Sequence, residues 1–499
     1  MLAGAYAATL VATEGEPLLV APLIGAVLGM AVFVRPAFGL YMLFAAAILL
    51  EQFEITGLDP LTARTHFFQN LSGFSSVPLR LSASDLLATA TLASWGMRRL
   101  VGGNSPVRAG PIGFAVGAYF MVFVVGTAIG IARGGGWDAI TTLAEARGGV
   151  YACLLYFLTA NLVRERRQVL VLLWLFVLLV GVKALQGIGN YIEVQTHGPY
   201  WIEAVTAHED VIFFDVAMML ALVMAALRVR GAVYYVLLAS MPVILAAEVF
   251  TTRRVAYAAL AAAVLVVIMI AAVARPRLTA VVVALGTLVL IVYAVTFWNH
   301  SGPLAQPIAV FRGVVDPNSI SERDQLSNLW REIENDNIAY TVKQVPLTGV
   351  GLGQQYLFQK EPPALTNFVY WRYITHNALL WIWLKAGPYG AFAFWFLIAR
   401  VIMTGLQLYR RLDDPLLRAT ASFPVLLAVA QVVFSSLDLG LTYNRTMIVF
   451  GVALGLMAPL RAWVVSRETP QKATELAGQT VPSPLGGPLF PRRLPHPNM

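Results

Sequence analysis

Residues 300–377 read HSGPLAQPIAVFRGVVDPNSISERDQLSNLWREIENDNIAYTVKQVPLTGVGLGQQYLFQKEPPALTNFVYWRYITHN, the one long polar interval in an otherwise apolar sequence. Connections between secondary-structure elements are usually a handful of residues, and much longer ones tend to carry function. We therefore expect a large loop over residues 299–375, with the functional site on or beside it.

The rest of the chain has the composition of a membrane protein. Of the 499 residues, 58% are hydrophobic and only 12% are charged, so one water-soluble core cannot cover the apolar surface. A helix needs about 20 apolar residues to cross the hydrocarbon layer. We predict an all-α, polytopic transmembrane bundle of about 12–13 spans, near residues 17–34, 37–52, 83–100, 111–131, 146–163, 168–190, 209–228, 231–249, 255–274, 278–298, 376–406, 417–437 and 445–465.

Basic residues predict the orientation of this bundle. Arginines gather in every second connection, for example at Arg166 and Arg167 and at Arg275 and Arg277, and such connections face the cytoplasm. The long loop then faces outward. The predicted organisation is an N-terminal bundle of about ten spans (1–298), the extracytoplasmic loop (299–375), C-terminal spans (376–465) and a Pro-rich, disordered cytoplasmic tail (466–499).

Two adjacent arginines break the pattern. Arg253 and Arg254 stand in the connection after residues 231–249, which the alternation places on the outer side. Guanidinium groups there are costly unless an anion meets them, and arginine suits bidentate phosphate binding. An anion site is one interpretation. The alternatives are a span count that is wrong by one, or an ion pair between Glu248 and one of the two arginines.

The middle of the loop carries further basic candidates. Residues 321–344, SERDQLSNLWREIENDNIAYTVKQ, have the pattern of an amphipathic helix lying on the membrane surface. Arg323 and Arg331 on it could bind an anion. Alternatively, each could form a solvated pair with Asp324, Glu332 or Glu334.

The end of the loop contains a glycine turn and a histidine. Gly349, Gly351 and Gly353 in PLTGVGLG permit a tight turn whose backbone could approach a headgroup, or an ordinary loop. No strand precedes them, so a dinucleotide or P-loop site is excluded. His376 and Asn377 stand where the apolar pattern resumes. A histidine at that interface can take a proton, or it can simply cap the helix.

Other polar residues near span ends are weaker candidates. Arg147, near the outer end of the fifth predicted span, is an accessory candidate, and its alternative is a local pair with Glu145. His208, Glu209 and Asp210 are adjacent, but one histidine with two neighbouring carboxylates is weak spacing for a metal site. We predict no metal site.

The chain contains, in this order, TTRRVAYAAL (251–260), LWREIENDNIAYTVKQVPLTGVGLG (329–353) and THNALLWIWLKAGPYGAFAF (375–394). In these motifs it resembles the O-antigen ligase and polymerase superfamily of bacterial envelope proteins. Outside about residues 250–400 only the many-span layout agrees. In the family it resembles, outward-facing arginines hold the diphosphate of an undecaprenyl-diphosphate-linked glycan, and a loop histidine activates the acceptor hydroxyl.

The resemblance implies His376 as the catalytic residue. It implies diphosphate binding by Arg331 and by Arg253 or Arg254, while Arg323 is a rival for the loop position. Arg147, Asn377 and Gly351 are accessory candidates. The implied reaction is a metal-independent, inverting glycan transfer to a lipid A core or a growing polysaccharide, without a cofactor.

The implied enzyme lies in a bacterial inner membrane with its site facing the periplasm. Its partners would be the lipid-linked glycan, an acceptor glycolipid or polysaccharide and the bilayer, and no nucleic acid. A polymerase of the same superfamily and transfer onto protein are alternatives within this class. A lipid or polysaccharide transporter is the rival from another class, although polar groups gathered at one interface disfavour it. A glycan-binding scaffold is the non-catalytic alternative.

Overall fold

The computed structural model describes residues 17–466, except for 54, 56–57, 59, 75–77, 103–105, 198–204, 252, 301, 317–318, 320–321 and 364–367. From residue 467 onward, the predicted disordered tail lies outside the described residues. The described chain is helical, with two isolated bridges and no longer β structure. This confirms the all-α fold class.

Each predicted apolar segment is a helix. Before the loop these are α2 (Pro17–Val34), α3 (Pro36–Leu49), α5 (Ala83–Gly102), α6 (Gly113–Arg133), α7 (Ala139–Leu162), α8 (Arg166–His197), α9 (Asp210–Ala226), α10 (Ala232–Phe250), α11 (Arg254–Ala274) and α12 (Pro276–Phe297). After it come α15 (Ala378–Arg411), α16 (Pro415–Leu437) and α17 (Asn444–Gly455). The short α4 (Leu71–Phe74) lies between α3 and α5.

By length and composition, seven helices among the described residues could cross a membrane: α6, α8, α10, α12, α15, α16 and α17 with its continuation to Ser466. Shorter apolar helices lie at Gly25–Val34, Pro36–Leu49 and Arg254–Met269. The predicted 12–13 spans also include shorter or more polar helices such as α7, which carries Glu145 and Arg147. The chain is a multi-pass membrane protein.

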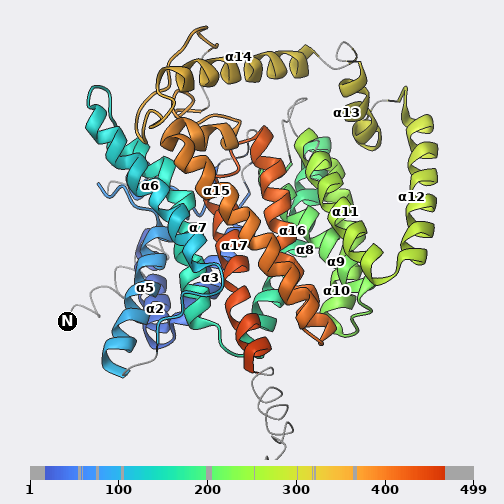
Figure 1. The fold of residues 1–499 in the computed structure, drawn as a ribbon, viewed down its shortest axis with the longest axis horizontal. Coiled ribbons are helices and arrows are strands. Elements are labelled where there is room, and N and C mark those ends of the chain that lie inside the picture. Colours follow the sequence, from blue (N-terminus) through green and yellow to red (C-terminus); the bar gives the residue numbers. More distant parts are fainter. Residues whose placement is uncertain are drawn as a thin grey trace, which may run out of the picture.

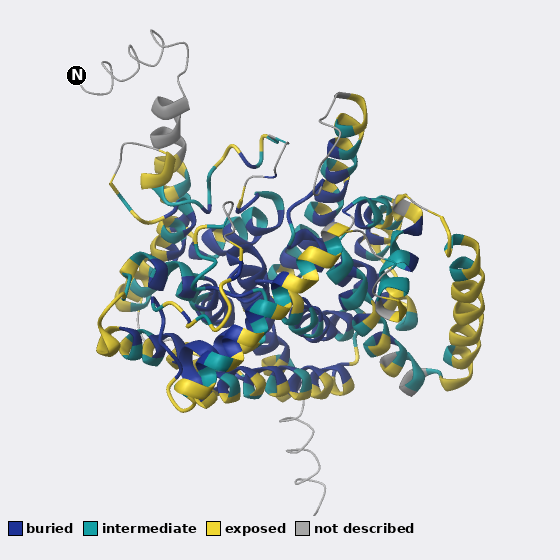
Figure 2. Ribbon diagram, turned by 90° about the horizontal axis from the view of Figure 1, so that it is seen from above, coloured by how far each residue is buried: buried dark blue, intermediate teal, exposed yellow. Residues whose placement is uncertain are grey.

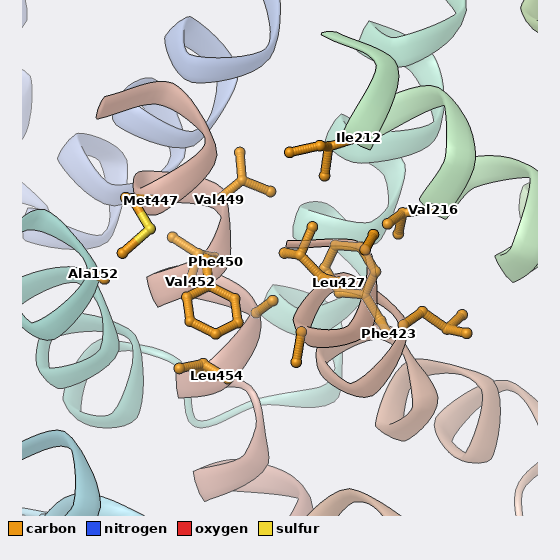
Figure 3. Close-up of a cluster of buried hydrophobic side chains, with 14 of the residues drawn as sticks. Ala152, Ile212, Val216, Phe423, Leu427, Met447, Val449, Phe450, Val452 and Leu454 are labelled. Atoms are coloured by element: carbon orange, nitrogen blue, oxygen red, sulfur yellow. The ribbon is translucent and has the colours of Figure 1, made fainter. Parts of the chain in front are cut away.

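The core forms where α17 packs between α7 and α16. Figure 3 shows Met447 of α17 beside Ala152 of α7, with Leu427 and Phe423 of α16 near Val216 of α9. The helices approach closely because a Cβ on Gly451 would lie 2.4 Å from the Ala152 carbonyl oxygen. Small residues are the usual means of such approach between membrane helices.

One apolar helix stands apart from this core. α12 lies at an edge of the molecule, and Figure 2 shows it exposed along its length. None of its residues is buried in the protein. A helix that is apolar all round needs an apolar environment, so α12 fits a place surrounded by lipid.

The loop covers one end of the bundle. It contains α13 (Gln306–Val315) and α14 (Glu322–Gln344), and Figure 1 shows α14 lying across the top of α15 and α16. The predicted helix is confirmed, and Trp330 and Ile338 on it are buried, whereas Leu326 and Leu329 are exposed. The connection between α15 and α16 lies at the opposite end of the bundle (Figure 1).

Candidate active site at the α14 end of the bundle

His376 is held by a buried carboxylate of α14. Glu334, whose side chain is 1% exposed, accepts a hydrogen bond from the His376 backbone N–H at 2.9 Å and lies 3.3 Å from Nδ1 of the imidazole. Trp330, one turn earlier on α14, packs edge-on against the ring with centroids 5.0 Å apart. A donor hydrogen bond from Nδ1 leaves Nε2 as the proton-accepting atom. The His376 side chain is 23% exposed, so a substrate can reach it.

Buried polar residues of α14 keep Glu334 in place. Asn337 accepts from the backbone N–H groups of Gln359 and Lys360 at 2.8 and 3.0 Å, and donates to the Lys360 carbonyl at 2.7 Å. One turn later, Thr341 exchanges hydrogen bonds with the backbone of Leu357. The segment after the glycine turn therefore runs along α14 and fixes it over the bundle.

Arg253 belongs to a second polar group at the same site. Its guanidinium donates to Nε2 of His208, and Nδ1 of His208 lies 3.6 Å from Oδ2 of Asp438, the residue that ends α16. Asp438 also accepts from the Tyr443 hydroxyl at 3.0 Å. Residues from three distant parts of the chain thus form a line of contacts from arginine to histidine to aspartate.

Asp438 connects the two groups electrostatically. Burial raises the pKa of its carboxyl, but the hydrogen bond from His208 and the charges of His208 and His376 outweigh burial, so the pKa lies well below the usual range. Each imidazole of the site thus lies beside a carboxylate: His208 beside Asp438, and His376 beside Glu334.

The remaining arginines occupy different positions. Arg254 bridges from the start of α11 to α14, 3.3 Å from Asp324 and 3.2 Å from Asn328. Arg331 is half-buried on α14 and makes no hydrogen bond or ion pair with any residue in the described ranges. The side chain of Arg323 lies outside the described residues.

For Arg253, Arg254 and Arg331, the alternative pairings that the sequence offered are not the ones found among the described side chains. The Glu248 carboxylate oxygens are buried and have no hydrogen-bond partner in the described part of the chain, so the proposed pair with Arg253 or Arg254 is wrong. The Asp324 carboxylate binds Arg254, and Glu334 binds His376. Sequence reasoning could not assign these pairs because the partners are about 40 or more residues apart.

Asn377 and Gly351 have clear structural contacts. Asn377, not His376, caps α15, since its side-chain oxygen accepts from the Leu380 N–H at 3.1 Å. Gly351 has a φ of 91°, donates to the Lys385 carbonyl at 3.1 Å, and packs so tightly that a Cβ would lie 2.2 Å from the Gly130 nitrogen. The close approach that this glycine permits is between the turn and the backbones of α6 and α15.

A buried ion pair holds the glycine turn. Glu145 of α7 binds Nζ of Lys385 at 2.7 Å, and its other oxygen accepts from the Gly353 N–H at 2.5 Å. The alternative in which Arg147 pairs with Glu145 is therefore wrong. Arg147 instead lies 3.1 Å from Asp85 and donates to Asn70 at 2.7 Å. α7 begins at Ala139, before the predicted 146, because both charges are paired inside the bundle.

A buried charge network lies beneath the site. Arg445 at the start of α17 is fully buried and binds Glu209 at 2.9 Å and Asp210 at 2.6 Å. It also donates to the carbonyls at the end of α3, and buried Lys183 pairs with Glu51 close by. Glu209 and Asp210 are thus occupied as arginine ligands. Among the described residues no group of three or more His, Cys, Asp or Glu side chains could hold a metal ion.

The roles of three residues were not predicted from the sequence. These are His208 and Asp438, which lie beside Arg253, and Arg445, which lies at the centre of the buried charge network. These residues could have been noticed because they are polar residues directly beside apolar runs, in SSLDLGLTYNR (435–445) and in HED (208–210). Ionisable groups at such depth are functional candidates by default. Which of them meet could be read only from the packing of α9, α16 and α17.

Part of the chain matches a known protein family. Residues 216–395 match the O-Antigen ligase family (Wzy_C). The match spans Arg253, Arg331, Glu334 and His376 and stops before Asp438. No curated protein sequence matches the chain. The match over residues 216–395, together with the bundle of apolar helices, supports the resemblance of this chain to the O-antigen ligase superfamily of polytopic membrane proteins.

Proposed function

We propose that this chain transfers a glycan from an undecaprenyl-diphosphate carrier to an acceptor hydroxyl, on a lipid A core or a growing polysaccharide, at the outer face of a bacterial inner membrane. The observation that carries the proposal is the pairing of His376 with buried Glu334, at the end of the bundle that also holds Arg253, Arg254 and Arg331. A proton acceptor beside several guanidinium groups suits a reaction with an anionic leaving group.

In the proposed step the acceptor oxygen attacks the anomeric carbon of the donor sugar. The bond between that carbon and the diphosphate oxygen breaks, its electron pair leaves with undecaprenyl diphosphate, and the hydroxyl proton passes to Nε2 of His376. Attack opposite the leaving group inverts the anomeric centre. Glu334 orients the imidazole and stabilises its protonated form, a contribution typical of a carboxylate behind a histidine.

The arginines neutralise the charge that develops on the diphosphate. Arg331 has no partner in the described ranges and is available for a phosphate oxygen. Arg254 would exchange its contacts with Asp324 and Asn328 for the donor, which would couple donor binding to α14. Because guanidinium groups supply the positive charge, the proposed step requires no divalent cation.

The arginine-rich connections at one end of the bundle support a periplasmic orientation of the site. The connection from α15 to α16 and the start of α8 meet through Arg166 and Asp414, 2.5 Å apart, at the end away from α14. Arginine-rich connections of a multi-pass protein face the cytoplasm. In the proposed enzyme, α14 and His376 therefore face the periplasm.

The test is a transfer assay with purified protein in proteoliposomes. Wild type, His376→Ala and His300→Ala would be incubated, in EDTA, with undecaprenyl-diphosphate glycan and either a lipid A core or more lipid-linked glycan. We expect product with wild type and with His300→Ala, an exposed histidine of the same loop. His376→Ala should bind the donor but lose transfer by about 100- to 10,000-fold.

Outcomes of this assay separate the alternatives. Product only with the lipid A core identifies a ligase, and product only with lipid-linked glycan identifies a polymerase. Equal transfer by wild type and His376→Ala would refute the role of His376. Movement of the intact donor across the bilayer without any transfer product would instead favour a transporter.

A further inference from the structure

A cavity lined by arginines lies at the end of the bundle away from α14. It has a volume of about 460 Å³ and opens between the break that separates α2 from α3, the end of α5 and the connection from α7 to α8. The described residues that line it include Arg35, Arg98, Arg99 and Arg164, and none of the described lining residues is acidic. Figure 1 shows α5 ending on the side of the bundle opposite α14, so this cavity is separate from the candidate active site.

The local structure places each guanidinium at the cavity. Arg35 precedes Pro36 in an extended conformation at the start of α3. Arg98 in the last turns of α5 donates to the carbonyls of Phe33 and Val34, which end α2. Arg99 lies over the Trp95 ring, 6.0 Å from its centroid. These contacts join the ends of α2 and α5 around the cavity.

Arg164 completes the lining from a third part of the chain. It follows α7, and its Nε donates to the Asn161 carbonyl at 3.2 Å. Within the described ranges, Arg35, Arg98 and Arg164 form no ion pair with a carboxylate. The neighbouring Arg166, in contrast, is paired with Asp414.

A general excess of basic residues on the cytoplasmic side does not account for this arrangement. That preference concerns the number of Lys and Arg residues in loops, and it does not bring arginines from three separate segments to one cavity. Like charges gathered around a small volume repel one another unless an anion lies between them. Arginine binds phosphate oxygens through two parallel hydrogen bonds.

The rim of the cavity indicates what kind of phosphate it takes. Large apolar side chains next to the arginines are exposed: Phe33 and Val34 at the end of α2, and Leu100 and Val101 at the end of α5, the last at 90%. A soluble phosphate would gain nothing from these side chains, whereas acyl chains would cover them. Basic pockets between membrane helices on the cytoplasmic side are known to take phospholipid headgroups.

We propose that this cavity binds the phosphate headgroup of an anionic glycerophospholipid, with the acyl chains lying along α2 and α5. The bound lipid would neutralise the guanidinium groups of Arg35, Arg98 and Arg164 and join the α2–α3 break to α5 and α7. The site is independent of glycan transfer.

The test measures lipid binding to the full-length protein in detergent by native mass spectrometry. Phosphatidylglycerol and phosphatidylcholine would be titrated into wild type, Arg35→Gln/Arg164→Gln and the matched control Arg275→Gln/Arg277→Gln, which removes two arginines from another connection. A basic group next to an anionic lipid strengthens binding about fivefold. We expect the Arg35/Arg164 variant to bind phosphatidylglycerol about 25-fold more weakly, and the control to bind it as wild type does.

Several results would overturn the proposal. These are equal binding of phosphatidylglycerol and phosphatidylcholine by wild type, unchanged phosphatidylglycerol binding by the Arg35/Arg164 variant, or an equal loss in the control. Pyrophosphate would also be titrated. If it binds wild type as tightly as the lipid does, and its binding is lost in the Arg35/Arg164 variant, the cavity is a site for a soluble anion. If the double variant does not fold, Arg35→Gln alone, a change at an exposed residue, should weaken binding about fivefold, and unchanged binding would refute the assignment.

Discussion

Replacing Glu334 with Gln should slow glycan transfer without weakening donor binding. Glu334 is almost fully buried and accepts from both the backbone N–H and Nδ1 of His376, at 2.9 and 3.3 Å. Gln keeps one acceptor oxygen but removes the negative charge that stabilises the protonated imidazole. A hydrogen bond to a charged group contributes about 1.5–3 kcal/mol, and losing an orienting partner of this kind typically costs about 10- to 100-fold. We expect kcat to fall within that range while KM for the lipid-linked donor stays unchanged.

The assay is the proteoliposome transfer reaction, carried out with a double-mutant cycle. Because Glu334 acts through His376, the double variant Glu334→Gln/His376→Ala should be no slower than His376→Ala alone. Glu332→Gln is the matched control, since Glu332 lies two residues earlier on α14 and is exposed. The proposed role of Glu334 is refuted if Glu334→Gln transfers at the wild-type rate. It is also refuted if the fold-losses in rate of the two single variants multiply in the double variant. A rise in KM with unchanged kcat would instead assign Glu334 to substrate binding.

Three further predictions concern other parts of the structure. Arg331→Gln should raise KM for the lipid-linked donor about tenfold, because one charge-assisted contact is lost. The same change at Arg312 of α13, whose guanidinium donates to the Trp298 carbonyl, should leave KM unchanged, and equal KM values for both variants would remove Arg331 from the site. Arg445→Met should lower the free energy of unfolding by about 3–5 kcal/mol, because Glu209 and Asp210 lose their partner. The measurement is thermal denaturation in detergent. A loss of stability no larger than that caused by Arg410→Met, a change at an exposed residue, would contradict this. Gly351→Ala should destabilise the folded protein, since φ is 91° and the added Cβ would meet the backbone of α6; wild-type stability together with weaker donor binding would point to a ligand contact instead.

The helices of this protein follow from local sequence pattern. Apolar runs of about 20 residues predict membrane helices wherever they occur, and each predicted run is a helix. The amphipathic segment around Trp330 was likewise predicted correctly as a helix. The start of α7 was misplaced because Glu145 and Arg147 lower the local hydropathy, and only their pairing with Lys385 and Asp85 makes them compatible with burial.

The arrangement of the candidate site was partly predictable. The motif around His376 and the arginines predicted a site at the loop, and the structure brings His376 and Arg254 into contact with α14 of that loop. The tertiary structure distinguishes the two adjacent arginines: Arg253 donates a hydrogen bond to His208, and Arg254 donates one to Asn328 of α14. Neighbours in sequence at a helix start can point to different partners, so sequence alone left that choice open.

Sequence by itself determined that the protein is an all-helical membrane protein. The hydrophobicity of each segment depends only on the residues in that segment, so it can be read along the chain without knowledge of the packing. Only the tertiary structure decided which polar groups meet. Glu334 with His376, Asp438 with His208, and Arg445 with Glu209 are separated by 42, 230 and 236 residues. A buried charge is stable only when its partner lies within a few ångströms, and that distance is set by how the helices pack.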